Sequence, residues 1–100
     1  MVKHFYVYIL ANARNGALYI GMTGNIHRRM EEHKKHLVEG FSSKYDVTKL
    51  VYVEQHDTFI SAATREKRMK TWQRKWKLRI IEELNPEWKD LSENGDIIFD

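Results

Sequence analysis

The feature that most constrains the fold is a pair of apolar segments joined by a short turn near the start of the chain. Residues 5–11, "FYVYILA", are rich in aromatic and β-branched residues, and residues 17–21, "ALYIG", follow after "NARNG". Such segments favour β-strands, and the Asn15-Gly16 pair suits a tight turn with positive φ. The sequence therefore predicts a β-hairpin.

The apolar residues of the next segment recur at the spacing of a helix. They fall at steps of four, three and four: Ile26, Met30, His33 and Leu37. Thr23 or Asn25 is placed to cap the start of this helix, and Gly40 is placed to end it. Residues 47–55, "VTKLVYVEQ", then predict a third strand. One helix therefore separates the hairpin from this strand.

A long apolar stripe occupies the second half of the chain, with Asp57 or Thr58 as its cap and Asn85 near its end. Its members are Ala62, Met69, Trp72, Trp76 and Ile80. A break near Gln73 divides it into two predicted helices, and residues 86–100 are expected to form an acidic tail of the same single domain. The order β-β-α-β-α-α predicts an α+β fold, a small three-stranded antiparallel sheet flanked by helices.

Length and composition limit the kinds of site that the chain can hold. One hundred residues make one domain, too small for a catalytic domain with a separate recognition domain. Without cysteine, a metal must be held by oxygen or imidazole. The apolar run from Phe5 to Ala11 is far too short to span a bilayer, and we find no targeting segment. We expect a cytoplasmic protein that does not bind membranes.

The charges are divided between a basic centre and an acidic end. Residues 65–79 hold eight Lys and Arg with one acid, whereas residues 82–100 hold seven acids and one Lys. A basic surface near tryptophans favours nucleic acid as the partner, although a solvated basic helix has the same composition. The candidate nucleic-acid-binding residues are Arg65, Lys67, Arg68, Lys70, Arg74 and Lys75.

Four polar residues of the hairpin and the first helix are candidates for a site. Tyr8 and Tyr19 lie on paired strands, where their hydroxyls could meet, although tyrosine is also common in strands for packing. Arg29 and His33 are four residues apart and share a helix face that borders the core. Arg29 suits either a phosphate clamp or a salt bridge, and His33 is either a site residue or a buried structural histidine.

Glu66 is the most informative single residue because it lies in the apolar stripe, between Ala62 and Met69. A carboxylate there is costly unless it is paired or bound to a cation. Two interpretations remain open: a buried ion pair with Arg29, or a ligand for one Mg²⁺ or Mn²⁺ ion whose shell is completed by a substrate phosphate.

Taken in order, five elements resemble the GIY-YIG nuclease family. They are "VYI" at 7–9, "LYIG" at 18–21, Arg29, His33 and Glu66. The resemblance covers roughly residues 4–85, so we expect a GIY-YIG-like domain over 1–85. The pattern from Trp76 to Trp88 is similar to that of small stand-alone bacterial members. Two positions depart from the family pattern: Tyr6 replaces the glycine of the first motif, and Asn85 is the nearest candidate for the asparagine that often follows the glutamate helix.

The resemblance implies a role for each of these residues in phosphodiester hydrolysis. Tyr8 and Tyr19 match the two motif tyrosines, one of which acts as general base, and which one stays open. Arg29 would contact the scissile phosphate, His33 would lie beside it, and Glu66 would bind the divalent metal. The expected substrate is DNA more than RNA. A nucleic-acid-binding module without hydrolysis is the main alternative, and an adaptor using Trp72, Trp76 and Trp88 is a third.

Overall fold

The computed structural model of the protein describes residues 3–37, 40 and 45–92. In chain order the elements are β1 (Phe5–Ala11), β2 (Leu18–Thr23), α1 (Ile26–Lys34), β3 (Lys49–His56), α3 (Phe59–Thr71) and α4 (Arg74–Leu84). This order confirms the predicted β-β-α-β-α-α arrangement and the α+β class. Within the described residues, no helix has both the length and the apolar character needed to cross a membrane.

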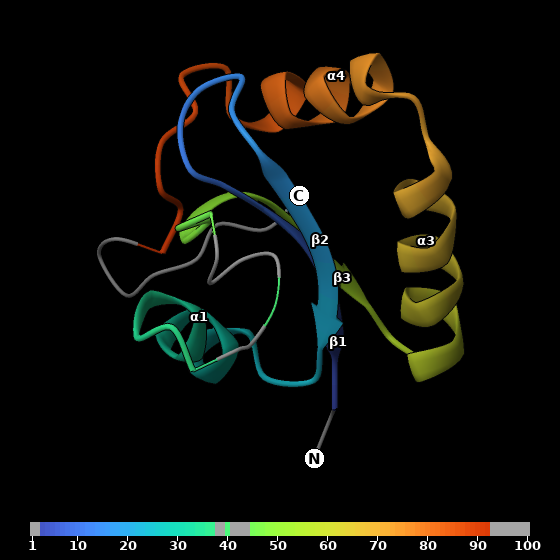
Figure 1. The fold of residues 1–100 in the computed structure, drawn as a ribbon. Coiled ribbons are helices and arrows are strands. Elements are labelled where there is room, and N and C mark those ends of the chain that lie inside the picture. The colour runs from blue at the N-terminus through green and yellow to red at the C-terminus, as the bar shows by residue number, and fades with distance from the viewer. Residues whose placement is uncertain (1–2, 38–39, 41–44, 93–100) are drawn as a thin grey trace.

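The three strands form one antiparallel sheet in the order β2-β1-β3. The β1–β2 hairpin turns through Asn15, whose φ of 58° lies in the left-handed region that asparagine tolerates. Figure 1 shows α1 on one side of the sheet, with α3 and α4 covering the other. Because β1 is the central strand and both faces of the sheet are covered, its side chains are buried on both sides.

Alternation along β1 divides the core into two clusters. Val7 and Ile9 belong to the cluster beneath α3 and α4, together with Met69 and Ile81. Tyr8 and Leu10 point to the opposite face and pack with residues of α1 such as Ile26 and Met30. This alternation explains why "FYVYILA" is an almost continuous apolar run. It also places the Tyr8 ring on the α1 side of the sheet.

The helix starts agree with the predicted caps, but the end of α1 differs from the prediction. Asn25 accepts a hydrogen bond from the Arg28 amide, and Thr58 caps α3 in the same way. α1 ends at Lys34 because His36 takes a left-handed conformation (φ 57°) and the Leu37 amide bonds to the Glu32 carbonyl. The prediction that Leu37 belongs to the apolar stripe is therefore wrong, since 67% of its surface is exposed.

The segment after α4 is part of the packed domain as far as the structure describes it. Trp88 is fully buried in the core, so it is not available to an adaptor surface. The Asn85 amide donates to the Val51 and Lys89 carbonyls, and the Leu91 amide donates to the Leu50 carbonyl. Asn85 therefore fixes this turn against β3. The remainder of the predicted acidic tail, 93–100, lies outside the described residues.

Candidate functional site

The tyrosine of the central strand packs against the glycine of its hairpin partner. Tyr8 is fully buried and faces Gly21 across the β1–β2 pairing. A Cβ atom on Gly21 would lie 2.5 Å from Tyr8 Oη and 3.0 Å from a ring carbon of Tyr19. Since non-bonded heavy atoms settle at about 3.5 Å or more, any larger residue would displace a phenol ring. Glycine at this position therefore lets both tyrosines occupy their places.

Helix α1 brings a histidine onto these two rings. Tyr8 Oη and His33 Nε2 lie 3.0 Å apart in a buried hydrogen bond. The centroid of the His33 ring is 5.7 Å from that of Tyr8 and 5.3 Å from that of Tyr19, both at steep angles. We call Tyr8, Tyr19 and His33 the tyrosine cluster. The structure thus brings together three of the five residues predicted for a catalytic site.

Burial and neighbouring charge keep the two hydrogen-bonded groups neutral. Burial raises the pKa of Tyr8 far above its ordinary value, and Tyr19 adds to this, while Arg29 opposes it through its charge and a hydrogen bond. Burial, and after it the positive charge of Arg29, lower the pKa of His33 to about 4. At neutral pH a phenol therefore faces a neutral imidazole, whose Nε2 can accept the phenolic proton.

Arg29 lies at the rim of the tyrosine cluster, beside an open cavity of about 340 Å³. The cavity is lined by mainly polar and basic residues: Lys3, Thr23, Gly24, Asn25, Arg28, Arg29 and Glu32. The Arg29 side chain is 36% exposed, and its Nε lies 3.1 Å from Glu32 Oε1. The structure thus pairs Arg29 with Glu32 and not with Glu66. A partly exposed guanidinium next to Tyr8 is suited to bind a phosphate that arrives from solvent.

Glu66 contributes a carboxylate from α3. Its side chain is 21% exposed, and its Oε2 lies 3.3 Å from Lys70 Nζ. The negative charge of Glu66 is close enough to contribute to the raised pKa of Tyr8. Among the described residues, no three His, Asp or Glu side chains converge to hold a metal ion. One carboxylate suits Mg²⁺ or Mn²⁺ only where substrate oxygens and water complete the shell, and Glu66 fits such a site.

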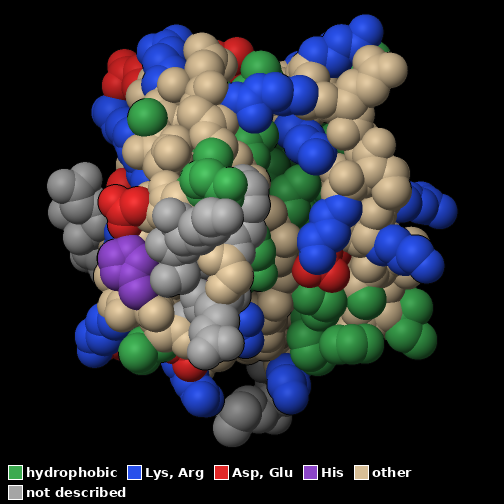
Figure 2. All heavy atoms as spheres, viewed as in Figure 1, with side chains coloured by type: hydrophobic (Ala, Val, Ile, Leu, Met, Phe, Trp, Pro, Cys, Tyr) green, Lys and Arg blue, Asp and Glu red, His purple; other side chains and the backbone are tan. Residues whose placement is uncertain are grey.

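The basic residues predicted to bind nucleic acid fall into two groups. Three contact other residues of the fold: Arg65 with Glu54, Lys70 with Glu66, and Arg74 with the carbonyl oxygens of Asn15 and Gly16. The other three, Lys67, Arg68 and Lys75, have exposed side chains. Figure 2 shows Lys and Arg side chains gathered over the part of the surface where α3 lies. Part of this positive charge is therefore already paired within the fold.

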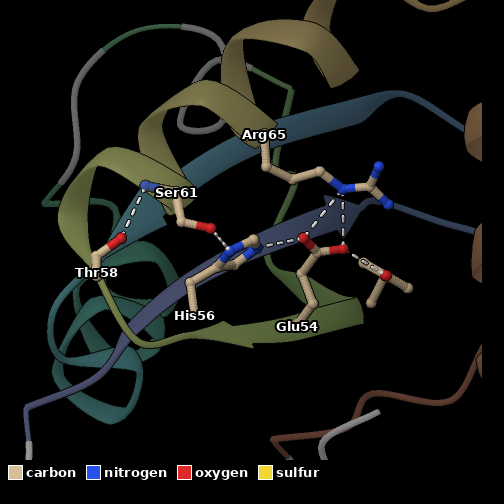
Figure 3. Close-up of polar contacts among 6 residues, drawn as sticks. Glu54, His56, Thr58, Ser61 and Arg65 are labelled. Carbon is tan, nitrogen blue, oxygen red and sulfur yellow. Dashed lines mark hydrogen bonds and ion pairs between the residues drawn. The ribbon is translucent and has the colours of Figure 1, made fainter.

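A second polar cluster, which the sequence did not predict, links β3 to α3 (Figure 3). Its members, which we call the glutamate cluster, are Tyr52, Glu54, His56 and Arg65. Glu54 accepts hydrogen bonds from Tyr52 at 2.7 Å and from Arg65 at 3.0 Å, and its Oε2 is 2.5 Å from His56 Nε2. Burial alone would raise the pKa of Glu54, but these hydrogen bonds lower it. The alternating Tyr-x-Glu-x-His pattern of β3 was the signal that all three side chains share one face.

Comparison with known proteins gives consistent results. The sequence model described as the GIY-YIG catalytic domain matches residues 4–79. The chain is 37% identical to UPF0213 protein SAV0488 of Staphylococcus aureus (strain Mu50) and 38% identical to UPF0213 protein SH2523 of Staphylococcus haemolyticus, each covering 83% of this chain and 99% of the relative. The solution NMR structure of UPF0213 protein BH0048 from Bacillus halodurans has the same fold, with a TM-score of 0.55 and 21% identity over 93% of this chain and 98% of that one.

Proposed function

Since the chain belongs to the GIY-YIG catalytic domain family, we propose that it is a nuclease that uses a divalent metal ion to hydrolyse phosphodiester bonds in DNA. The observation that carries the proposal is the buried contact between Tyr8 and His33, with Arg29 beside it and the charge of Glu66 within electrostatic reach. These four side chains come from β1, α1 and α3, and they supply the groups that phosphodiester hydrolysis needs: a proton acceptor, a phosphate ligand and a metal ligand.

In this proposal Tyr8, and not Tyr19, passes the proton. Tyr8 is a phenol at neutral pH because its pKa is raised, so it cannot act as a base unless it loses its own proton. His33 is neutral and in hydrogen-bonding contact, so it can take that proton as Tyr8 accepts one from the attacking water. Tyr19 then packs beside both rings and holds them in place.

Arg29 couples substrate binding to this proton transfer. Burial, and after it the charge of the Arg29 guanidinium, lowers the pKa of His33, which makes the imidazole a poor proton acceptor before the substrate binds. A phosphate bound to Arg29 would neutralise that charge and raise the basicity of His33. The histidine therefore becomes a better proton acceptor when a phosphodiester occupies the site.

Glu66 is the residue that would hold the metal ion. The ion, when bound, supplies positive charge that stabilises the leaving oxygen. Lys70 neutralises the Glu66 carboxylate in the absence of metal and must release it for binding. Both groups are partly exposed, so their ion pair is weak enough to be replaced by a divalent cation.

Cleavage of a panel of single-stranded, duplex and branched DNA and RNA, with Mg²⁺ or Mn²⁺, tests this proposal. We expect Glu66→Gln to reduce the rate by about 100-fold or more, since it removes electrostatic stabilisation of the transition state. Binding of the substrate, measured by fluorescence anisotropy, should be kept. Glu31→Gln is the matched control because it changes an exposed helical carboxylate that pairs only with Lys35 in the described contacts. Cleavage by Glu66→Gln at the wild-type rate would refute the proposal.

The main alternative is a nucleic-acid-binding module of the same fold that does not hydrolyse its ligand. Tyr6, which replaces the glycine of the first motif, favours this alternative because it departs from the family pattern. Binding without metal-dependent cleavage of any panel member would establish this function instead.

A further inference from the structure

An apolar groove lies where α3 and α4 meet, and no residue of the tyrosine cluster lines it. Its cavity of about 400 Å³ is lined by Trp72, Trp76, Arg79, Ile80 and Glu83. Figure 1 shows that α3 and α4 meet at a corner. Trp72 lies between the two helices and Trp76 in the first turn of α4, so these two residues line the groove from this corner. Trp76 is 44% exposed, which is unusual for the largest apolar side chain. The groove therefore presents an indole ring to solvent.

Positive charges surround the two indole rings of this groove. Lys75 Nζ and Arg79 Cζ lie 5.3 Å and 5.7 Å from the centroid of the Trp76 ring. Arg65 Cζ lies 4.9 Å from the centroid of Trp72, in a neighbouring cavity that shares Ile80 and Glu83 with the first. Glu83 is the one acid of the groove's lining, and it accepts a hydrogen bond from Arg79 at 3.1 Å. The two arginines are paired with Glu54 and Glu83, so the rim is aromatic and its net positive charge is that of Lys75.

We propose that this groove binds an unpaired base of single-stranded nucleic acid, stacked on Trp76, with the adjoining phosphates near Lys75 and Arg79. A base is flat and apolar on both faces and carries a phosphate at a short distance, so it matches an indole flanked by cations. Cation–π contacts of exposed side chains are weak, so a stacking base can displace them. A base pair in the interior of a duplex cannot stack on the indole, because both of its faces are covered by neighbouring pairs.

The inference deepens the proposed function, on which it rests for the identity of the substrate as nucleic acid. It adds that the substrate contains a single-stranded stretch, such as a gap, a flap or a free end. A hydrophobic peptide would use the same indole, but it would gain nothing from Lys75, Arg79 and Arg65. The charge of the rim therefore favours nucleic acid over protein as the ligand.

Binding measured without divalent metal, so that no cleavage occurs, tests the inference. The probes are fluorescein-labelled oligothymidylate, oligouridylate and a DNA duplex, and the readout is anisotropy. We expect Trp76→Ala to weaken binding of the single strands by about tenfold, and binding of the duplex by less than about twofold. Trp76→Phe, which keeps a stacking face, should restore most of the affinity. The two single-stranded probes show whether DNA or RNA is preferred.

Three results would overturn the inference. One is an affinity for the single strands that is unchanged in Trp76→Ala. Another is a loss of affinity for the duplex in Trp76→Ala that equals the loss for the single strands. The third is a wild-type dimer that Trp76→Ala converts to a monomer in sedimentation, which would assign the groove to a second copy of the chain. Because these measurements involve no cleavage, a chain that cuts nothing but binds single strands through Trp76 would refute the nuclease proposal and support the groove.

Discussion

The tyrosine cluster and the glutamate cluster lie on opposite faces of one small sheet and contain similar residues, but they differ in how their charges are paired. In the glutamate cluster a partly buried carboxylate receives hydrogen bonds from Tyr52 and Arg65, so charge and countercharge meet within the fold. In the tyrosine cluster the buried contact joins two neutral groups, Tyr8 and His33, and the charged Arg29 lies at the rim. The glutamate cluster therefore holds β3 and α3 together. In the tyrosine cluster, Arg29 can still bind an anion that arrives from solvent.

The largest expected effect is a loss of cleavage activity when the tyrosine cluster is changed, without such a loss when the glutamate cluster is changed. Tyr8→Phe removes the hydroxyl that we propose passes the proton, so we expect the cleavage rate at saturating substrate to fall by about 100-fold or more. Tyr52→Phe is the matched control, because it removes a buried hydroxyl that donates to Glu54 in the other cluster. Both variants should lose about 1 kcal/mol of unfolding free energy, the usual net worth of such a hydrogen bond. Equal cleavage rates for Tyr8→Phe and Tyr52→Phe would show that the tyrosine cluster is not catalytic.

The next effect tests the packing that places the tyrosine cluster. Gly21→Ala puts a Cβ atom 2.5 Å from the hydroxyl of a fully buried Tyr8, so the ring must move. We expect unfolding in urea to show a loss of about 2 kcal/mol, as for overpacked cores, and cleavage to fall with it. Gly24→Ala is the control, because its nearest neighbour would be at an ordinary 3.7 Å. Wild-type stability in Gly21→Ala would mean that the Tyr8 ring has room to move.

A third prediction uses pH to distinguish the clusters. Burial and Arg29 lower the pKa of His33 from 6.5 to about 4, so the fold favours neutral histidine. The resulting stability is present above pH 6.5 and is lost as the pH falls toward 4. Integration over this shift predicts a loss of about 2 kcal/mol between pH 7 and pH 5. The pKa of Glu54 is lowered from 4.5, so the stability that it contributes is present above that pH and is lost only in more acidic solution.

Denaturant unfolding at several pH values measures this effect, with His33→Gln as the comparison. The glutamine amide can accept the Tyr8 hydrogen bond through its oxygen but does not titrate in this range. The variant should therefore be less sensitive than the wild type to a fall from pH 7 to pH 5. If the wild type and His33→Gln lose the same unfolding free energy between pH 7 and pH 5, protonation of His33 is not the cause of the loss.

The sequence predicted the tyrosine cluster better than the glutamate cluster. The reason is that local sequence patterns place the tyrosine cluster, whereas tertiary packing brings the glutamate cluster together. Period-2 alternation and the Asn15 turn fix the register of the hairpin, which sets Tyr8 opposite Gly21. Helical spacing then places Arg29 and His33 on one face of α1. Glu54 and Arg65 come together only through the packing of α3 on β3, which no local pattern encodes.

Two predictions failed, and for different reasons. Leu37 continues the helical period, but the helix stops three residues before it because the chain turns at His36. Trp88 was a candidate for an adaptor surface, yet its ring is fully buried in the core. The end of α1 is set by the local turn at His36, whereas the burial of Trp88 is set by its packing in the core, with residues from distant parts of the chain such as Val7 and Met69.

The smallest effect expected on activity comes from Glu54→Gln, which should disturb the glutamate cluster alone. The amide keeps the shape of the carboxylate but loses its charge, so the partly buried Arg65 loses its ion pair. We expect a loss of about 2 kcal/mol in unfolding free energy, reduced from the value for a fully buried pair because Arg65 is 34% exposed. The cleavage rate per folded molecule should stay within about twofold of the wild type, since none of the proposed catalytic groups contacts Glu54. Thermal unfolding and cleavage of the same preparation provide both measurements. A selective loss of cleavage would mean that the position of α3, and with it Glu66, depends on this cluster, and that the two faces of the sheet are coupled.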